Sequence, residues 1–177
     1  KGALSEALEK FQQSWVLLAE SYRRDHQSQS TFFELGQADF YIGQIHSEQG
    51  DIEKAEYFFM SYAEITRRLI LQQPENAEWV LEMAFALTNL GHLQELRNDG
   101  NSERALQFMQ SALEYNQIAL VLDPQNDYYR SELGQSHAFL ADAQRGVCDL
   151  EGAFQSRQAG ILLEQEILAE DSGNKTK

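Results

Sequence analysis

The sequence predicts an all-α fold built from antiparallel helix hairpins. Two observations carry this prediction: matching residues recur about every 48 positions, and each period contains two apolar patterns with helical spacing. The 177 residues include only two prolines, and the 42% hydrophobic and 24% charged composition is typical of a globular protein. A chain of this length can bury a sizeable hydrophobic core.

The period is visible in three independent series of identical residues. Members of each series are 48 or 50 residues apart: Ala7, Ala55, Ala105 and Ala153; Asn76, Asn126 and Asn174; Glu34, Glu82 and Glu132. A fixed period of this size indicates stacked supersecondary units. The alternation of 48 and 50 places two extra residues between Leu90 and Asn101, in a turn that is longer than its counterpart in the previous copy.

Within one period, apolar residues three and four positions apart mark two amphipathic helices. Leu35, Ala38, Ile42 and Ile45 belong to the first helix, and Ile52 begins a similar pattern in the second. Glycines and prolines punctuate these patterns, and the candidate capping residues are Asp51, Asn76, Ser102 and Asn126. We therefore expect seven helices, at residues 3–24, 29–48, 52–73, 77–97, 102–122, 127–146 and 150–169.

Particular residues mark each helix pair: small residues where the helices approach, a Gly-Asp turn, an alanine that opens the second helix, an aromatic residue four positions later, and Pro-x-Asn. The first copy has Ile42-Gly43, Gly50-Asp51, Ala55, Phe59 and Pro74-Glu75-Asn76. This pattern resembles the tetratricopeptide repeat. The second copy has Leu90-Gly91, Gly100-Asn101, Ala105, Met109 and Pro124-Gln125-Asn126. The third copy has Leu140-Ala141 and Ala153, with Arg157 at the aromatic position and Cys148 at the turn glycine.

The period differs from that of the ordinary repeat, which is ~34 residues. Each helix is longer by about seven residues, which is close to two full turns and therefore keeps the buried stripe continuous. HEAT-like hairpins, with a period of ~40–47 residues, are the competing assignment. The glycine, alanine and Pro-x-Asn positions favour the tetratricopeptide repeat.

The resemblance implies a right-handed α-α superhelix, or solenoid. We expect a single domain over residues 1–177, with a lone second-of-pair helix at 1–26, repeat 1 at 27–74, repeat 2 at 75–124, and repeat 3 with a tail at 125–177. The resemblance also suggests that the chain is the regulatory part of a larger, bacterial signalling protein.

Charge and composition exclude several classes of partner. The formal net charge of −14 would repel a phosphate backbone or an anionic lipid surface, so we expect neither nucleic-acid binding nor membrane contact by this segment. No apolar run is long enough for a membrane span, and the first residues lack the apolar core of a secretory signal. We expect a soluble protein, with the cytoplasm favoured over the periplasm.

No cluster of reactive side chains suggests an enzyme. None of the four histidines has a glutamate three positions before it or a second histidine four away, so no metal motif is present. The Glu34, Glu82 and Glu132 series is interpreted as first-turn acids that complement helix dipoles. Cys148 lies between Arg145 and Asp149, whose charges offset each other, so the sequence does not favour a reactive thiol. We expect no catalytic, cofactor-binding or metal-binding residues.

Binding is the function that the architecture favours, because stacked hairpins present their first helices along a concave face. The resemblance places twelve residues in this groove: Gln37, Phe40, Gln44, Ser47, Phe85, Thr88, His92, Glu95, Gln135, Ala138, Asp142 and Arg145. Such a polar lining with two aromatic residues suits a protein or peptide segment, and a basic segment is one option. The lysines and paired asparagines that clamp a C-terminal carboxylate in some relatives are missing.

Two alternatives stay open at this point. Phe40 and Phe85 can belong to the hydrophobic core instead of the groove, since aromatic residues at helical spacing usually do. The second alternative concerns function: exposed terminal helices can pair two copies of the chain into a homodimer. The last predicted helix supplies apolar residues without a following helix to cover them: Ile161, Leu162, Leu163, Ile167 and Leu168.

Overall fold

The computed structural model describes residues 2–97 and 102–174, which form seven α-helices and contain no strand. The helices are α1 (Gly2–Arg24), α2 (Gln29–Glu48), α3 (Ile52–Gln72), α4 (Ala77–Leu96), α5 (Ser102–Leu122), α6 (Asp127–Gly146) and α7 (Leu150–Asn174). This confirms the predicted all-α class and the predicted helix bounds to within one residue, except that α7 continues past residue 169. The predicted turn Gly100-Asn101 lies outside the described residues.

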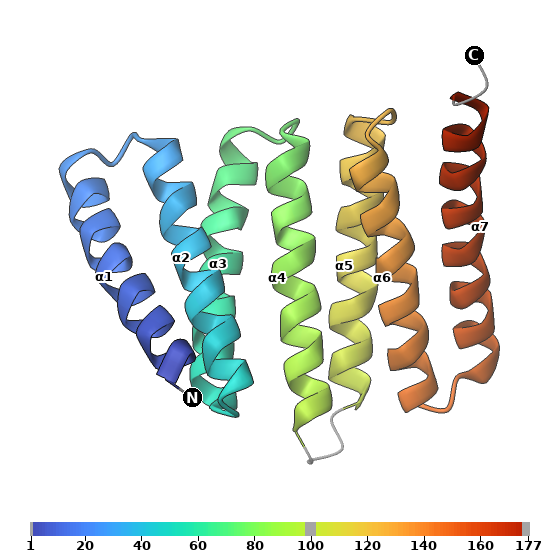
Figure 1. The fold of residues 1–177 in the computed structure, drawn as a ribbon, viewed down its shortest axis with the longest axis horizontal. Coiled ribbons are helices and arrows are strands. Elements are labelled where there is room, and N and C mark those ends of the chain that lie inside the picture. Colours follow the sequence, from blue (N-terminus) through green and yellow to red (C-terminus); the bar gives the residue numbers. More distant parts are fainter. Residues whose placement is uncertain (1, 98–101, 175–177) are drawn as a thin grey trace. The chain divides into compact units, whose positions relative to one another are not determined.

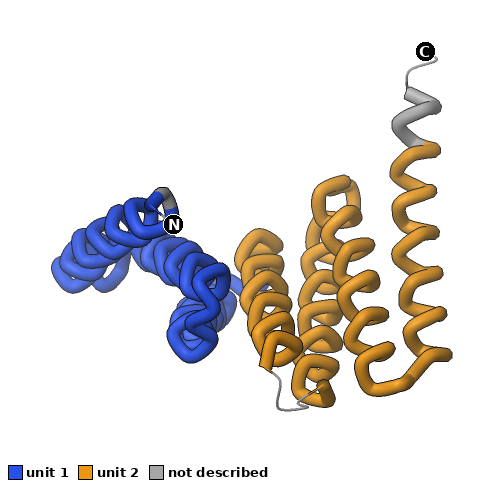
Figure 2. Tube along the Cα trace, turned by 60° about the horizontal axis from the view of Figure 1, so that its bottom comes forward, with its two compact units in different colours: residues 1–74 blue, residues 75–177 orange. Residues whose placement is uncertain are grey.

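The chain divides into two compact units, residues 1–74 with α1 to α3 and residues 75–177 with α4 to α7 (Figure 2). Within each unit, consecutive helices run antiparallel and pack side by side (Figure 1). The boundary falls at Pro74 and Glu75, where the repeat pattern predicts the end of repeat 1. The single-domain organisation and the right-handed winding of the whole stack stay predictions.

Side chains at the helix ends explain why the helices begin where they do. The Asp51 carboxylate accepts a hydrogen bond from the Lys54 backbone N–H, and the Asn76 and Asn126 side chains accept from backbone N–H groups in the first turns of α4 and α6. Each cap satisfies donors that the helix itself leaves unpaired and contributes about 1 kcal/mol. The predicted caps Asp51, Asn76 and Asn126 are therefore confirmed, whereas Ser102 is the first residue of α5 and not its cap.

The first unit has its core between α2 and α3. Ile42, Ala55, Phe59, Tyr62 and Leu69 are almost completely buried there. Gly43 makes this close packing possible: a Cβ atom at this position would lie 2.9 Å from the Phe59 ring. The small residue, the alanine and the aromatic of the first copy thus meet as the repeat pattern predicts.

The second unit repeats this arrangement between α4 and α5. Gly91 faces Met109, and a Cβ atom on Gly91 would lie 2.8 Å from the Met109 Cε. Ala105 and Met109 are both buried. Met109 also joins Leu140 and Ala143 of α6 in a core cluster, so α5 holds the neighbouring hairpin as well.

The third copy packs differently. Arg157 occupies the position of Phe59 and Met109, and its guanidinium lies at the surface instead of in the core. The close approach of α6 and α7 lies at Gly134 and Gly160, seven residues before Ala141 and three residues after Arg157. A Cβ atom on Gly160 would lie 2.9 Å from the Gly134 carbonyl oxygen there. In the third copy, two glycines therefore form the close helix contact that a glycine and an aromatic residue form in the first copy.

Candidate functional site

The predicted groove positions of the second unit lie on α4 and α6. His92 of α4 is half-exposed, and its Nδ1 lies 3.3 Å from Glu95 Oε2. The His92 ring also meets the edge of the Phe139 ring of α6, with centroids 4.9 Å apart. The structure thus brings two predicted residues, His92 and Glu95, next to an aromatic side chain on the adjacent first-of-pair helix.

Phe139 is a residue that the sequence prediction missed, since it assigned Ala138 to the groove. The Phe139 side chain packs partly against the core cluster around Met109 and Leu140 and partly against His92. The repeat register contained a signal for it, because Phe139 corresponds to Tyr41 of the first copy, another partly exposed aromatic residue.

Asp142 and Arg145 form the charged part of the α6 surface. Asp142 Oδ1 accepts a hydrogen bond from Arg157 Nη2 of α7 at 2.8 Å and lies 3.3 Å from Arg145 Nη2. Of the remaining predicted positions in this unit, Phe85, Thr88 and Ala138 are half-buried, and Gln135 is exposed. The surface of α4 and α6 therefore presents hydrogen-bonding groups of both charges around one aromatic ring.

The predicted groove positions of the first unit lie on α2, and all four are half-buried: Gln37, Phe40, Gln44 and Ser47. Phe40 packs against Tyr62 and Phe59 of α3, with ring centroids 5.3 and 6.1 Å apart. Gln37 Nε2 donates to the Tyr62 hydroxyl at 3.4 Å. Phe40 is thus shared between the core and the surface, and Gln37 is held in place by α3.

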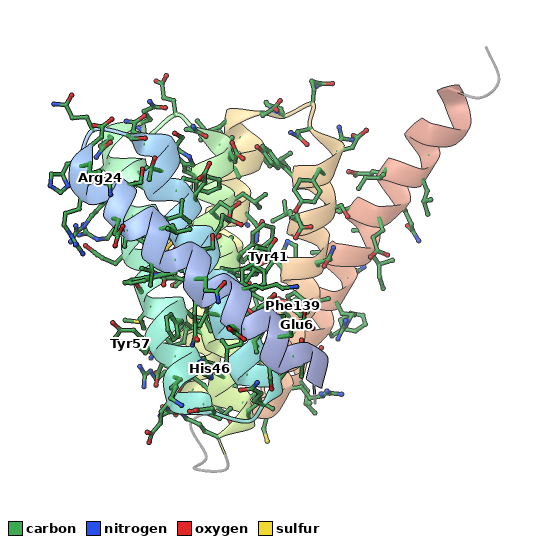
Figure 3. All side chains as sticks on the ribbon, turned by 60° about the vertical axis from the view of Figure 1, so that its left-hand side comes forward. Glu6, Arg24, Tyr41, His46, Tyr57 and Phe139 are labelled. Atoms are coloured by element: carbon green, nitrogen blue, oxygen red, sulfur yellow. The ribbon has the colours of Figure 1, made fainter. Side chains whose placement is uncertain are left out.

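An apolar pocket of about 260 Å³ on the first unit was not predicted. Its lining comes from all three helices of the unit: Gln12, Trp15, Val16, Ile42, Tyr57 and Phe58. Tyr57, labelled in Figure 3, projects from α3 at the rim and is about two-thirds exposed. Sequence reasoning could not find the pocket because its residues come from three separate helices and match no motif.

A buried carboxylate holds one wall of this pocket. Trp15 Nε1 of α1 donates to Asp39 Oδ1 of α2 at 2.7 Å, and the Ser61 hydroxyl of α3 donates to Asp39 Oδ2 at 2.6 Å. Asp39 is only 2% exposed, and burial raises its pKa to about 6, although both hydrogen bonds act in the opposite direction. One side chain therefore joins the three helices of the unit and fixes the orientation of the Trp15 indole.

His46 and His137 contribute to packing, whereas His26 is exposed. The imidazole of His46, labelled in Figure 3, is buried and stacks on Phe58, and this burial lowers its pKa. Burial also lowers the pKa of His137, which lies against Gly160 of α7. His92, by contrast, lies at the surface of α4.

The glutamate series is not what the sequence suggested. Glu34, Glu82 and Glu132 are each the sixth residue of their helix, whereas the first-turn acids of α4 and α6 are Glu78 and Asp127. The interpretation as first-turn acids is therefore wrong. Glu132 instead accepts a hydrogen bond from the Tyr128 side chain one turn earlier, and its burial raises its pKa.

Three further observations concern metal binding, the cysteine and membrane spans. Within residues 2–97 and 102–174, no group of three or more His, Cys, Asp or Glu side chains is arranged to hold a metal ion. Cys148 is exposed and unpaired in the turn between α6 and α7. None of the described helices is both long and apolar enough to cross a lipid bilayer.

Comparison with known proteins found similar solved structures. A thermophilic TPR protein of Thermus thermophilus, TTC0263, is 12% identical over 95% of this chain and 94% of that chain, with a TM-score of 0.48. A MamA RS-1 ArsTM double mutant is 14% identical over 93% and 92% of the two chains, with a TM-score of 0.30, and MamA MSR-1 C2 is 14% identical over 90% and 98%, with a TM-score of 0.25.

No protein-family profile and no curated protein matches the sequence. The resemblance to the tetratricopeptide repeat therefore rests on the sequence motifs and on contacts within the hairpins. Gly43 meets Phe59 beside the buried Ala55 in the first copy, and Gly91 meets Met109 beside the buried Ala105 in the second. These hairpin contacts agree with the resemblance of the sequence to the tetratricopeptide repeat.

Proposed function

We propose that the chain is a non-catalytic protein-interaction scaffold that binds a peptide or protein segment along its first-of-pair helices. The observation that carries this proposal is the α4 and α6 surface of the second unit. Gly91, Met109 and Leu140 form the buried core of this unit. His92 and Glu95 do not contribute to that core. They remain half-exposed or exposed beside Phe139 and are available to a partner.

The chemistry of this surface favours an extended or short helical segment with one apolar side chain. Phe139 and the half-buried Phe85 offer apolar contact, while Gln135, Glu95 and His92 offer donors and acceptors for a peptide backbone. The net charge of −14 favours a basic segment over an acidic one. A regulatory role within a larger signalling protein is part of the same proposal.

Selection from a phage-displayed random peptide library tests the proposal and does not require the natural partner to be identified first. Peptides are selected on the intact chain, and their affinities are then measured by fluorescence polarisation. The double variant His92→Ala/Glu95→Gln removes the exposed pair on α4. We expect the selected peptides to lose at least about tenfold in affinity, which corresponds to about 1.4 kcal/mol.

The matched control is Gln110→Ala/Glu114→Gln on α5, which also alters two exposed side chains and removes one carboxylate. Circular dichroism verifies that both variants keep their helix content. The proposal predicts unchanged affinity for the control. Equal affinity of the selected peptides for the α4 variant, or failure to select any peptide, would overturn it.

A further inference from the structure

Helix α7 packs only one of its faces. Ser156 and Gly160 are buried against α6, and Leu163 and Ile167 are half-buried on the same side. On another face, Phe154 is 65% exposed, Ile161 46% and Leu168 67%. A helix of the second unit therefore carries an uncovered row of large apolar side chains.

The spacing of these exposed side chains is regular. Phe154, Ile161 and Leu168 are seven residues apart, and seven residues are close to two helical turns, so the three side chains share one stripe. We call this row the α7 stripe. Such a stripe supplies one of the two apolar positions per heptad through which long helices pair.

We propose that the α7 stripe is a docking surface for α7 of a second copy of this chain, with the two helices antiparallel. A twofold axis through Ile161 would place Ile161 against the partner's Ile161. Because the stripe is evenly spaced, the same axis places Phe154 against the partner's Leu168 and Leu168 against the partner's Phe154. The surface is thus complementary to itself, as a twofold interface requires. This inference does not rest on the proposed peptide site.

Charge complementarity selects the antiparallel orientation. Arg157 and Glu164 lie on the same shoulder of the α7 stripe, three residues after Phe154 and three residues after Ile161. In an antiparallel pair, corresponding shoulders face each other, so Arg157 lies beside the partner's Glu164 and the contact occurs twice. In a parallel pair, this shoulder would instead face Gln158 and Gln165, and neither ion pair would form.

The existing contacts of these two residues permit this arrangement. Arg157 Nη2 donates to Asp142 Oδ1 at 2.8 Å. A guanidinium has five N–H donors and the Arg157 side chain is 47% exposed, so donors remain for a second carboxylate. Among the described residues, Glu164 has no ion-pair partner. The second copy would therefore add a fourth charged group to the cluster of Arg145, Asp142 and Arg157.

Sedimentation velocity over a concentration series provides the first test. The proposal expects the wild-type chain to shift from monomer to dimer as its concentration rises. Ile161→Glu places two carboxylates on the twofold axis and should weaken dimerisation at least about tenfold. Val121→Glu is the control, because Val121 is an exposed apolar residue on α5 of the same unit. A wild-type monomer at all concentrations, or a dimer insensitive to Ile161→Glu, would overturn the proposal.

Charge reversal provides the second test. Arg157→Glu and Glu164→Arg should each weaken the homodimer, because each leaves only like charges in the two contacts. A mixture of the two variants restores both opposite-charge contacts in a heterodimer, and so does the double variant with itself. Sedimentation of the mixture should therefore recover the dimer. Failure of the mixture and of the double variant to recover it would contradict the assigned register.

Disulfide trapping tests the orientation. The cysteine variants are made in a Cys148→Ser background. On mild oxidation, the Ile161→Cys variant should form a disulfide between the two copies at residue 161. The Phe154→Cys variant should form one only when it is mixed with the Leu168→Cys variant. Disulfides need Cβ atoms about 4 Å apart, so they report the register directly. Self-cross-linking of Phe154→Cys would show a parallel pair and overturn the proposed geometry.

Discussion

At the scale of single residues, the two turns that follow α2 and α6 have the same hydrogen-bond pattern with different amino acids. In the first turn, the Gly50 N–H donates to the Ser47 carbonyl and the Asp51 N–H donates to the His46 carbonyl, at 3.0 and 2.9 Å. Cys148 takes the place of Gly50 in the second turn and donates to the Arg145 carbonyl at 3.0 Å. Both are Schellman motifs, which require a left-handed residue at the position of Gly50.

Gly50 has a φ of 78° and Cys148 a φ of 64°, so the cysteine adopts a conformation that suits glycine. Cys148→Gly should raise the free energy of unfolding by about 1 kcal/mol. Gly50→Ala should lower it by about 1 kcal/mol through the backbone alone, because a Cβ atom there would meet nothing within 4 Å. Urea denaturation measures both changes. A loss of stability in Cys148→Gly would mean that the thiol makes a stabilising contribution larger than the backbone strain.

Asp39 is the other residue whose environment has a measurable consequence. Its hydrogen bonds to Trp15 and Ser61 place a carboxyl group inside the three-helix unit. The Trp15 N–H can only donate, whereas the Ser61 hydroxyl can donate to the carboxylate or accept from the protonated acid. The site therefore accommodates both protonation states, and burial favours the neutral one.

The pH dependence follows from the pKa of Asp39, which rises from 3.8 to about 6 on folding. Between these values the folded protein holds a proton that the unfolded chain has released, so its stability falls as the pH rises through this window. The difference corresponds to about 3 kcal/mol. Asp39→Asn cannot titrate and should lack this contribution.

Urea denaturation of wild type and Asp39→Asn at intervals from pH 4 to pH 7 tests this prediction. The stability of wild type minus that of the variant should decrease with rising pH, and all other titrating groups cancel in the subtraction. A difference that stays constant or increases with pH would show that Asp39 is ionised throughout this range in the folded protein.

At the scale of helices, each hairpin owes its close packing to a small residue, but the neighbours of these residues differ. The partners of Gly43 and Gly91 are side chains, Phe59 and the end of Met109. The neighbour of Gly160 is a backbone carbonyl, that of Gly134. A side chain can rotate away from an added methyl group, whereas a helix backbone must shift as a whole.

Two substitutions at the α6–α7 contact should therefore have opposite effects. Gly160→Ala would place a Cβ atom 2.9 Å from the Gly134 carbonyl oxygen and should lower the free energy of unfolding by about 1–3 kcal/mol. Gly134→Ala would meet its nearest atom at 3.7 Å and should raise stability by up to about 1 kcal/mol, because alanine is the better helix former. Thermal and urea denaturation compare the two. Equal effects would show that α6 and α7 can separate at little cost.

At the scale of the whole molecule, the two compact units coincide with the repeat pattern. The first unit joins α1 to the first complete hairpin, and the second contains the two later hairpins. The proposed peptide surface of α4 and α6 and the proposed dimer surface of α7 both lie in the second unit. The variants that test them change different helices, so either proposal can fail while the other holds.

The helices and their contacts could be predicted largely from the sequence because they depend on local patterns. The apolar spacing and the caps Asp51, Asn76 and Asn126 place the helix ends, and the positions of Gly43 and Gly91 predict where the first two hairpins approach. The third copy had lost these signals. Its contact at Gly134 and Gly160 was not predicted, because the motif positions of this copy are Ala141 and Arg157. Gly134 is nevertheless in register with Gly36, another close approach, in the first copy.

The candidate site was less predictable, since neighbouring residues on a helix differ in direction by about 100° and a small shift in register changes which one faces a partner. Phe139 instead of Ala138 meets His92, and His137 turns toward α7. The network of Trp15, Asp39 and Ser61 joins residues from three helices, and no sequence spacing indicates it.

By itself, the sequence determined that this protein consists of long antiparallel helix hairpins, because helical periodicity, capping and small-residue positions act within one repeat. Only the tertiary structure decided that Asp39 is buried among three helices and that Phe139 meets His92. It also decided that α7 uses glycines to pack on α6 and leaves Phe154, Ile161 and Leu168 uncovered. These features depend on distances between side chains of different helices, and those distances are set by how the hairpins pack together.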